Sequence, residues 1–164
     1  MMPTIDFAQI LAHIAALAAA YLLALPIGWD REKEARSAGL RTFPLVALAS
    51  CGFVQASESL MTDAPQATAY VVNGLITGMG FIGGGAILKH GASVYGTATA
   101  ASLWATGAIG AAVGLGSYEV AITIALITFL TLKLLPLLKD EDDDADSPAP
   151  AKSAAKKARK RPQE

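Results

Sequence analysis

The residues best suited to chemistry are charged side chains gathered between positions 29 and 41. Asp30, Glu32 and Glu34 supply carboxylate oxygens there. Mg²⁺ accepts such hard ligands in proteins and keeps several of its own waters. Basic residues are interleaved with them, namely Arg31, Lys33, Arg36 and Arg41. The pattern fits either a cation-responsive site or an ion-paired structural or partner-docking surface, and the basic residues favour the second.

A second acidic group lies further along the chain. Glu58 and Asp63 are close in sequence, and Gln55 comes one helical turn before Glu58. Two carboxylates at this place could bind an external divalent ion, although a single interfacial Glu that reaches water is the simpler interpretation. The candidate metal ligands are therefore Asp30, Glu32 and Glu58, and we expect no cofactor other than Mg²⁺ itself.

Catalysis is not expected from the remaining polar residues. The two histidines, His13 and His90, are predicted to lie toward opposite sides of a membrane, so no nucleophilic triad can be assembled from them. His13 has no carboxylate within one helical turn, which predicts a hydrogen-bonded packing residue rather than part of a proton relay. The sequence thus indicates a protein that is not an enzyme.

Residues 78–83 (GMGFIG) match the dinucleotide-binding pattern G-x-G-x-x-G. That pattern requires a strand before it, a helix after it and an acidic residue about 20 positions later. The next acidic residue here is Glu119, which is much too distant. Nucleotide binding is therefore excluded.

The elements that must position these residues are apolar helices. Of the 27 charged side chains, 13 lie in residues 1–138 and 14 in the last 26 residues. So few charges cannot cover the surface of a water-soluble globule, and about 20 apolar residues suffice to cross a bilayer. The sequence predicts an all-α integral membrane protein of five transmembrane helices, at Ile5–Gly28, Thr42–Met61, Ala69–Leu88, Ala98–Leu115 and Tyr118–Leu138.

The basic residues predict the orientation of these spans. All 13 Lys and Arg residues fall on one side of the predicted membrane, and basic loops remain cytoplasmic. We therefore expect the N-terminus outside and the C-terminus in the cytoplasm, with a multi-pass chain in a bacterial inner membrane. Residues 1–138 form the membrane domain, and residues 139–164 form a charged, disordered cytoplasmic tail whose basic part is able to lie on anionic lipid. No nucleic-acid partner is expected.

Glycines at a spacing of four suggest how the helices pack. Small residues at this spacing lie on one helix face and let two backbones approach closely in lipid. We expect the third and fourth spans to form the tightly packed centre, with Trp104 packed against their glycine faces. The helix-packing residues are Gly74, Gly78, Gly80, Gly83, Gly84, Gly107, Gly110 and Gly114.

Several motifs resemble one family of bacterial membrane proteins. Residues 28–34 (GWDREKE) and 39–42 (GLRT) are similar to the first cytoplasmic motif of the MgtC/SapB family, residues 78–85 (GMGFIGGG) to its third span and residues 96–110 (GTATAASLWATGAIG) to its fourth. The chain departs from the family's usual pattern at Asp30, where Glu is common, and at Phe43, where His is common. The C-terminal soluble domain of many members is not expected in this chain.

The resemblance implies a role in adaptation to low Mg²⁺ or related stress, by modulating other membrane machinery. The lipid bilayer and either a second copy of the chain or another inner-membrane protein are the expected partners. The cytoplasmic cluster that would act is Asp30, Arg31, Glu32, Arg36, Arg41 and Thr42. Two alternatives remain, a direct Mg²⁺ transporter or channel built as an oligomer and a purely structural assembly protein.

Overall fold

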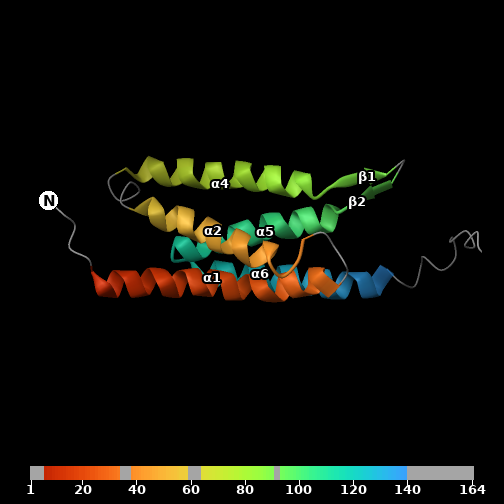
Figure 1. Ribbon diagram of the computed structural model, residues 1–164, viewed down its shortest axis with the longest axis horizontal. Coiled ribbons are helices and arrows are strands. Elements are labelled where there is room, and N and C mark those ends of the chain that lie inside the picture. The colour runs from red at the N-terminus through yellow and green to blue at the C-terminus, as the bar shows by residue number, and fades with distance from the viewer. Residues whose placement is uncertain (1–5, 34–37, 59–63, 91–92, 140–164) are drawn as a thin grey trace, which may run out of the picture. The chain divides into compact units, whose positions relative to one another are not determined.

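The computed structural model describes residues 6–33, 38–58, 64–90 and 93–139 of the chain. These residues form five helices and one two-stranded antiparallel sheet (Figure 1). The elements are α1 (Phe7–Lys33), α2 (Thr42–Ala56), α4 (Pro65–Gly85), β1 (Leu88–His90), β2 (Ser93–Tyr95), α5 (Thr97–Gly114) and α6 (Tyr118–Lys139). The expected helical class is therefore confirmed.

The chain divides into two compact units. The first is Met1–Lys133 and holds every element up to the last turns of α6. The second is Leu134–Glu164, of which the structure describes only the end of α6. The predicted tail lies outside the described residues except for Lys139, and it stays a prediction.

Among the described residues, two helices are long and apolar enough to cross a membrane, over Phe7–Lys33 and Tyr118–Pro136. The helix Thr42–Ala56 is apolar but shorter, with 15 residues. This finding agrees with a membrane protein. Length and composition alone do not establish the expected five spans.

The helix bounds differ from the expected ones at the ends of the first two helices. The first helix continues past Gly28 to Lys33, so that Trp29, Asp30 and Arg31 are helical. The second ends at Ala56 rather than Met61.

A hairpin of two short strands stands where a plain linker was expected. Leu88 pairs with Tyr95 and Lys89 with Val94. The residue after the hairpin, Gly96, has a φ of +84°, and a Cβ there would collide with the carbonyl oxygen of Ala86. Only glycine fits this position, since it combines a left-handed backbone with a close backbone neighbour.

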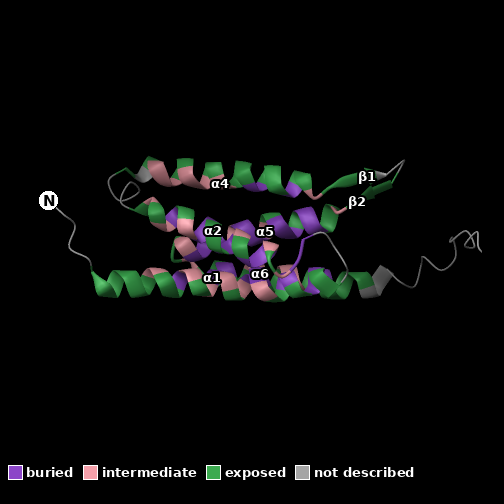
Figure 2. Cartoon of the chain, in the orientation of Figure 1, coloured by how far each residue is buried: buried purple, intermediate pink, exposed green. Residues whose placement is uncertain are grey.

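The first unit is organised around α5, which packs against α1, α2 and α4. Its buried Leu103, Ile109 and Val113 join Ala47 and Cys51 of α2 in one hydrophobic core. In Figure 2 the buried residues are concentrated on α2 and α5, whereas α4 is mostly exposed.

The closest helix contact joins α5 to α2. A Cβ at Gly110 would collide with the carbonyl oxygen of Ala47, and one at Gly114 would lie 2.7 Å from Cβ of Val54. A Cβ at Gly107 would lie 2.6 Å from Cγ of Met79, so this glycine receives a side chain of α4. The glycines of α5 therefore pack mainly on α2, a neighbour that their spacing in the sequence did not specify.

The glycines of α4 differ in their surroundings. A Cβ at Gly83 would lie 3.2 Å from the carbonyl oxygen of Ala100, which is a true close approach to α5. At Gly74, Gly78, Gly80 and Gly84 an added Cβ would meet nothing within 4 Å. In the part of the chain that the structure describes, these four glycines do not bring α4 onto another helix, because the spacing of small residues does not specify a partner face.

Substitution by valine should destabilise the protein at a closely packed glycine and have little effect at a glycine that borders open space. We expect Gly110→Val to lower the free energy of unfolding by about 1–3 kcal/mol, because the valine side chain overpacks the contact between α5 and α2. Thermal unfolding of the purified protein in detergent measures this effect.

The matched control is Gly80→Val on α4, where an added Cβ meets open space. This variant should unfold close to the wild-type temperature. Equal destabilisation by both substitutions would show that α5 does not have the close contact described.

Candidate functional site

The end of α1 and the start of α2 meet in a compact corner, here called the α1–α2 corner (residues 28–33 and 38–43). A Cβ at Gly28 would lie 3.2 Å from the carbonyl oxygen of Gly39 and 3.3 Å from Cβ of Phe43. Phe43 is fully buried. The absence of a side chain at Gly28 therefore lets the incoming chain cross α1 at short range.

Two charged residues are buried in this corner. Nη2 of Arg31 donates to Oδ2 of Asp30 at 2.7 Å, and the side chains are 3% and 10% exposed. A charge withdrawn from water is tolerated only when it is paired, so each residue requires the other. The ion-paired alternative thus describes Asp30 and Arg31, which are consecutive residues of α1.

The carboxylate of Glu32 binds the segment that leads into α2. Oε2 of Glu32 accepts a hydrogen bond from the backbone N–H of Leu40 at 3.1 Å. The same carboxylate occupies the space that a Cβ of Gly39 would need. Glu32 therefore acts as a strap between α1 and the residues that begin α2.

The outer surface of the corner is formed by Trp29, Lys33 and Arg41, which are exposed. Nζ of Lys33 lies 5.3 Å from the centroid of the Trp29 ring, within range of a cation–π interaction. Thr42 is half-buried at the first position of α2. Arg36 and Glu34 lie outside the described residues.

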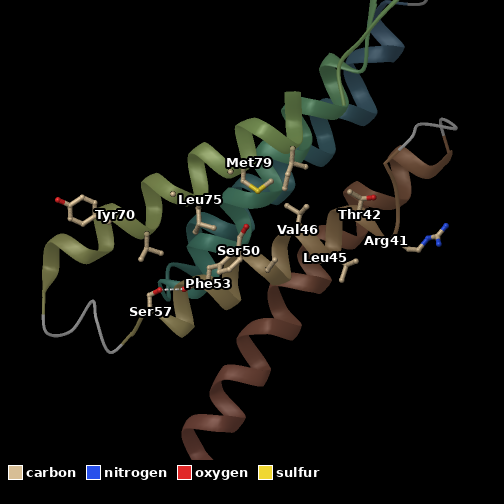
Figure 3. Close-up of a pocket in the computed structure, with 15 residues that line it drawn as sticks. Arg41, Thr42, Leu45, Val46, Ser50, Phe53, Ser57, Tyr70, Leu75 and Met79 are labelled. Atoms are coloured by element: carbon tan, nitrogen blue, oxygen red, sulfur yellow. Dashed lines mark hydrogen bonds between the residues drawn. The ribbon is translucent and has the colours of Figure 1, made fainter. Parts of the chain in front are cut away.

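A long groove separates α2 from α4 (Figure 3). Its volume is about 760 Å³, and its walls are largely apolar. Arg41 and Thr42 stand at one end, and Ser57 and Tyr70 stand at the other. The main apolar side chains are Leu45, Val46 and Phe53 from α2 and Leu75, Met79 and Ile82 from α4.

A smaller cavity of about 330 Å³ lies among α4, α5 and α6, and Trp104 lines it beside Gly107. Trp104 is 50% exposed. The expectation that this ring packs into the glycine faces is therefore corrected, since Met79 takes the place over Gly107.

At the opposite end of α1, His13 contacts Glu58 and Gln55, and the sequence did not predict these contacts. Nε2 of His13 lies 3.1 Å from Oε2 of Glu58, and Nε2 of Gln55 donates to the backbone oxygen of His13 at 3.3 Å. These residues line a cavity of about 470 Å³ together with Gln9 and Thr68. His13 and Glu58 are 45 positions apart, so only the antiparallel pairing of the first two helices could have indicated their contact.

The three candidate metal ligands are not brought together. Asp30 pairs with Arg31 and Glu32 binds Leu40 in the α1–α2 corner, whereas Glu58 faces His13 beyond the far end of α2. Within the described ranges no group of three His, Cys, Asp or Glu residues is placed to hold a metal ion. Asp63 lies outside those ranges.

Comparison with known proteins gives one family. The model of the MgtC family matches residues 17–141. The chain is 38% identical over 115 residues to "Protein MgtC" of Salmonella typhimurium strain LT2, a match that covers 70% of this chain and 48% of that protein. It is 41% identical over 120 residues to "Protein MgtC" of Brucella abortus strain 2308, covering 71% and 50%.

The chain thus spans about half the length of the curated relatives it matches. No solved structure matches it.

The buried ion pair gives a stability prediction. We expect Asp30→Asn to lower the free energy of unfolding by about 3–5 kcal/mol, because the buried guanidinium of Arg31 would lose the carboxylate to which it donates. Thermal unfolding in detergent measures the loss. The control is Glu119→Gln at an exposed position of α6, which should change stability by less than about 0.5 kcal/mol; similar small effects of both changes would contradict the pairing.

The His13–Glu58 contact should contribute much less. Its side chains are 37% and 58% exposed, and solvent screens such pairs. We expect a double-mutant cycle with His13→Asn and Glu58→Gln to give a coupling energy of about 0.2–1 kcal/mol. Strictly additive effects of the two substitutions would mean that the side chains do not interact in solution.

Proposed function

Because the chain belongs to the MgtC family of membrane proteins, we propose that it acts in bacterial adaptation to low Mg²⁺ or a related stress. It does so by modulating other proteins of the inner membrane. The family membership supports the stress role, and the α1–α2 corner supports the mode of action.

All five helices cross the inner membrane in this proposal, with the N-terminus outside and the C-terminus in the cytoplasm. The basic side chains support this orientation, since Lys33 and Arg41 at the α1–α2 corner lie at the same predicted side as Lys89 and Lys133. The outer ends of α1 and α2 then carry the His13–Glu58 pair.

The observation that carries the proposal is the combination of a rigid interior and a varied exterior at the α1–α2 corner. Asp30 and Arg31 are buried and paired, and Glu32 binds the backbone of Leu40, which holds the end of α1 to the start of α2. Trp29 and Lys33 are exposed on the same helical turns. An exposed tryptophan presented on a fixed framework is typical of the residues that anchor protein partners. The partner is a cytoplasmic segment of another inner-membrane protein or of a second copy.

The positions of the carboxylates also favour modulation over transport. In the described part of the chain, Asp6, Asp30, Glu32, Glu58 and Glu119 all lie at or near helix ends. A path for Mg²⁺ through a membrane requires oxygen ligands along its length. An oligomeric transporter is therefore the less favoured alternative.

A growth experiment tests the proposal. In a bacterium that lacks its own copy and grows poorly at low Mg²⁺, the wild-type chain should restore growth, whereas Lys33→Glu combined with Trp29→Ala should restore little of it. A change of two central contact residues weakens a protein interface by about 2 kcal/mol or more. The matched control is Lys89→Glu on the hairpin, which should behave as wild type when membrane levels are equal. Full growth with the double variant would contradict the proposal.

Transport is tested with the purified chain in proteoliposomes that hold a trapped Mg²⁺ indicator. We expect no Mg²⁺ entry above that of empty vesicles, while a known channel gives a clear signal. Saturable entry reduced by Glu58→Gln would replace modulation by direct transport.

A further inference from the structure

The proposed function does not involve the groove between α2 and α4. It extends along α2 from Arg41 to Ser57. The 15 residues of this helix measure about 22 Å at 1.5 Å per residue. The groove therefore extends along the full length of α2.

Glycines of α4 create this space. Gly74 and Gly78 line the groove, and an added Cβ at either would meet nothing within 4 Å. They share a helix face with Val71, Leu75 and Ile82, which recur at intervals of three and four residues. Gly80 lies two residues from Gly78, on the far side of α4, and does not line the groove. The two glycines thus widen the groove where larger side chains would fill it.

The length and the walls of the groove suit a hydrocarbon chain. A slender, flexible acyl chain can follow the groove along α2 and contact the apolar side chains of both helices.

The end of the groove at Arg41 indicates which headgroup the hydrocarbon chain carries. Arg41 is exposed at the start of α2, and within the described ranges its guanidinium has no hydrogen bond or ion pair (Figure 3). Thr42 beside it offers a hydroxyl group. A guanidinium binds phosphate oxygens in a two-pronged geometry. This end of the groove therefore complements a phosphate, and the described residues at the opposite end, Ser57 and Tyr70, are uncharged.

We propose that the α2–α4 groove holds an acyl chain of one anionic phospholipid, whose phosphate is bound by Arg41. The lipid fills the space left by Gly74 and Gly78 and completes the contact between α2 and α4. This inference rests on the groove alone and is independent of the proposed stress role.

Native mass spectrometry of the full chain in detergent tests the proposal. The probes are phosphatidylglycerol and phosphatidylcholine with the same acyl chains, added at equal concentrations. The wild type should retain one phosphatidylglycerol in preference to phosphatidylcholine. Gly78→Leu should lower retention of both lipids by about fivefold or more, the factor expected from overpacking a site by one side chain. Gly80→Leu is the matched control and should retain lipid as the wild type does.

The headgroup contact is tested separately. Arg41→Gln should reduce the preference for phosphatidylglycerol by about fivefold, the contribution of one basic residue facing anionic lipid. Lys89→Gln, an exposed basic residue away from the groove, should leave the preference unchanged.

Three results would overturn the proposal. They are the absence of any retained phospholipid, equal retention by Gly78→Leu and Gly80→Leu, and a preference that Arg41→Gln does not alter. A dimer that Gly78→Leu abolishes, without bound lipid, would assign the groove to a second copy. If Gly78→Leu fails to unfold cooperatively, Ala49→Leu on the opposite wall replaces it and should reduce retention to the same extent.

Discussion

The short distance between α5 and α2 is the constraint on which the first unit depends. It exists because Gly110 and Gly114 have no side chains where the backbone of α2 passes, at Ala47 and Cys51. Apolar burial does little to drive helices together in lipid, so van der Waals contact between closely approaching backbones must do this work. With α2 held on one side, the remaining surface of α5 is available to α1 and to Met79 of α4.

The two ends of the α1–α2 pair are built differently. At one end Asp30 and Arg31 are withdrawn from water, and Glu32 straps the chain that leads into α2. At the other end His13 and Glu58 face an open polar cavity and keep much of their hydration. The Glu32 hydrogen bond joins α1 to the residues that begin α2, whereas solvent screens the exposed His13–Glu58 pair. The α1–α2 corner is therefore the better-defined surface of the two.

Much of this arrangement could be predicted from the sequence, and the rest could not for identifiable reasons. The lengths of the apolar runs indicated the five helices, and the mixed charges between Asp30 and Arg41 favoured an ion-paired surface. The glycine spacing predicted packing faces, and Gly110 and Gly114 make close contacts with α2, a neighbour that the spacing did not specify. Gly74 and Gly78 have the same spacing of four and border an open groove, because local spacing describes one face and not what lies opposite it.

The attachment of α4 has a consequence for access to the groove. Met79 and Gly83, in the last two turns of α4, contact α5, whereas the turns around Gly74 face the open groove. A segment with few buried contacts separates from its neighbours at a lower free energy than the core does. The earlier turns of α4 therefore separate from α2 at a lower free energy than α1 or α5 does. Access to the groove is set by these turns and not by the packed core.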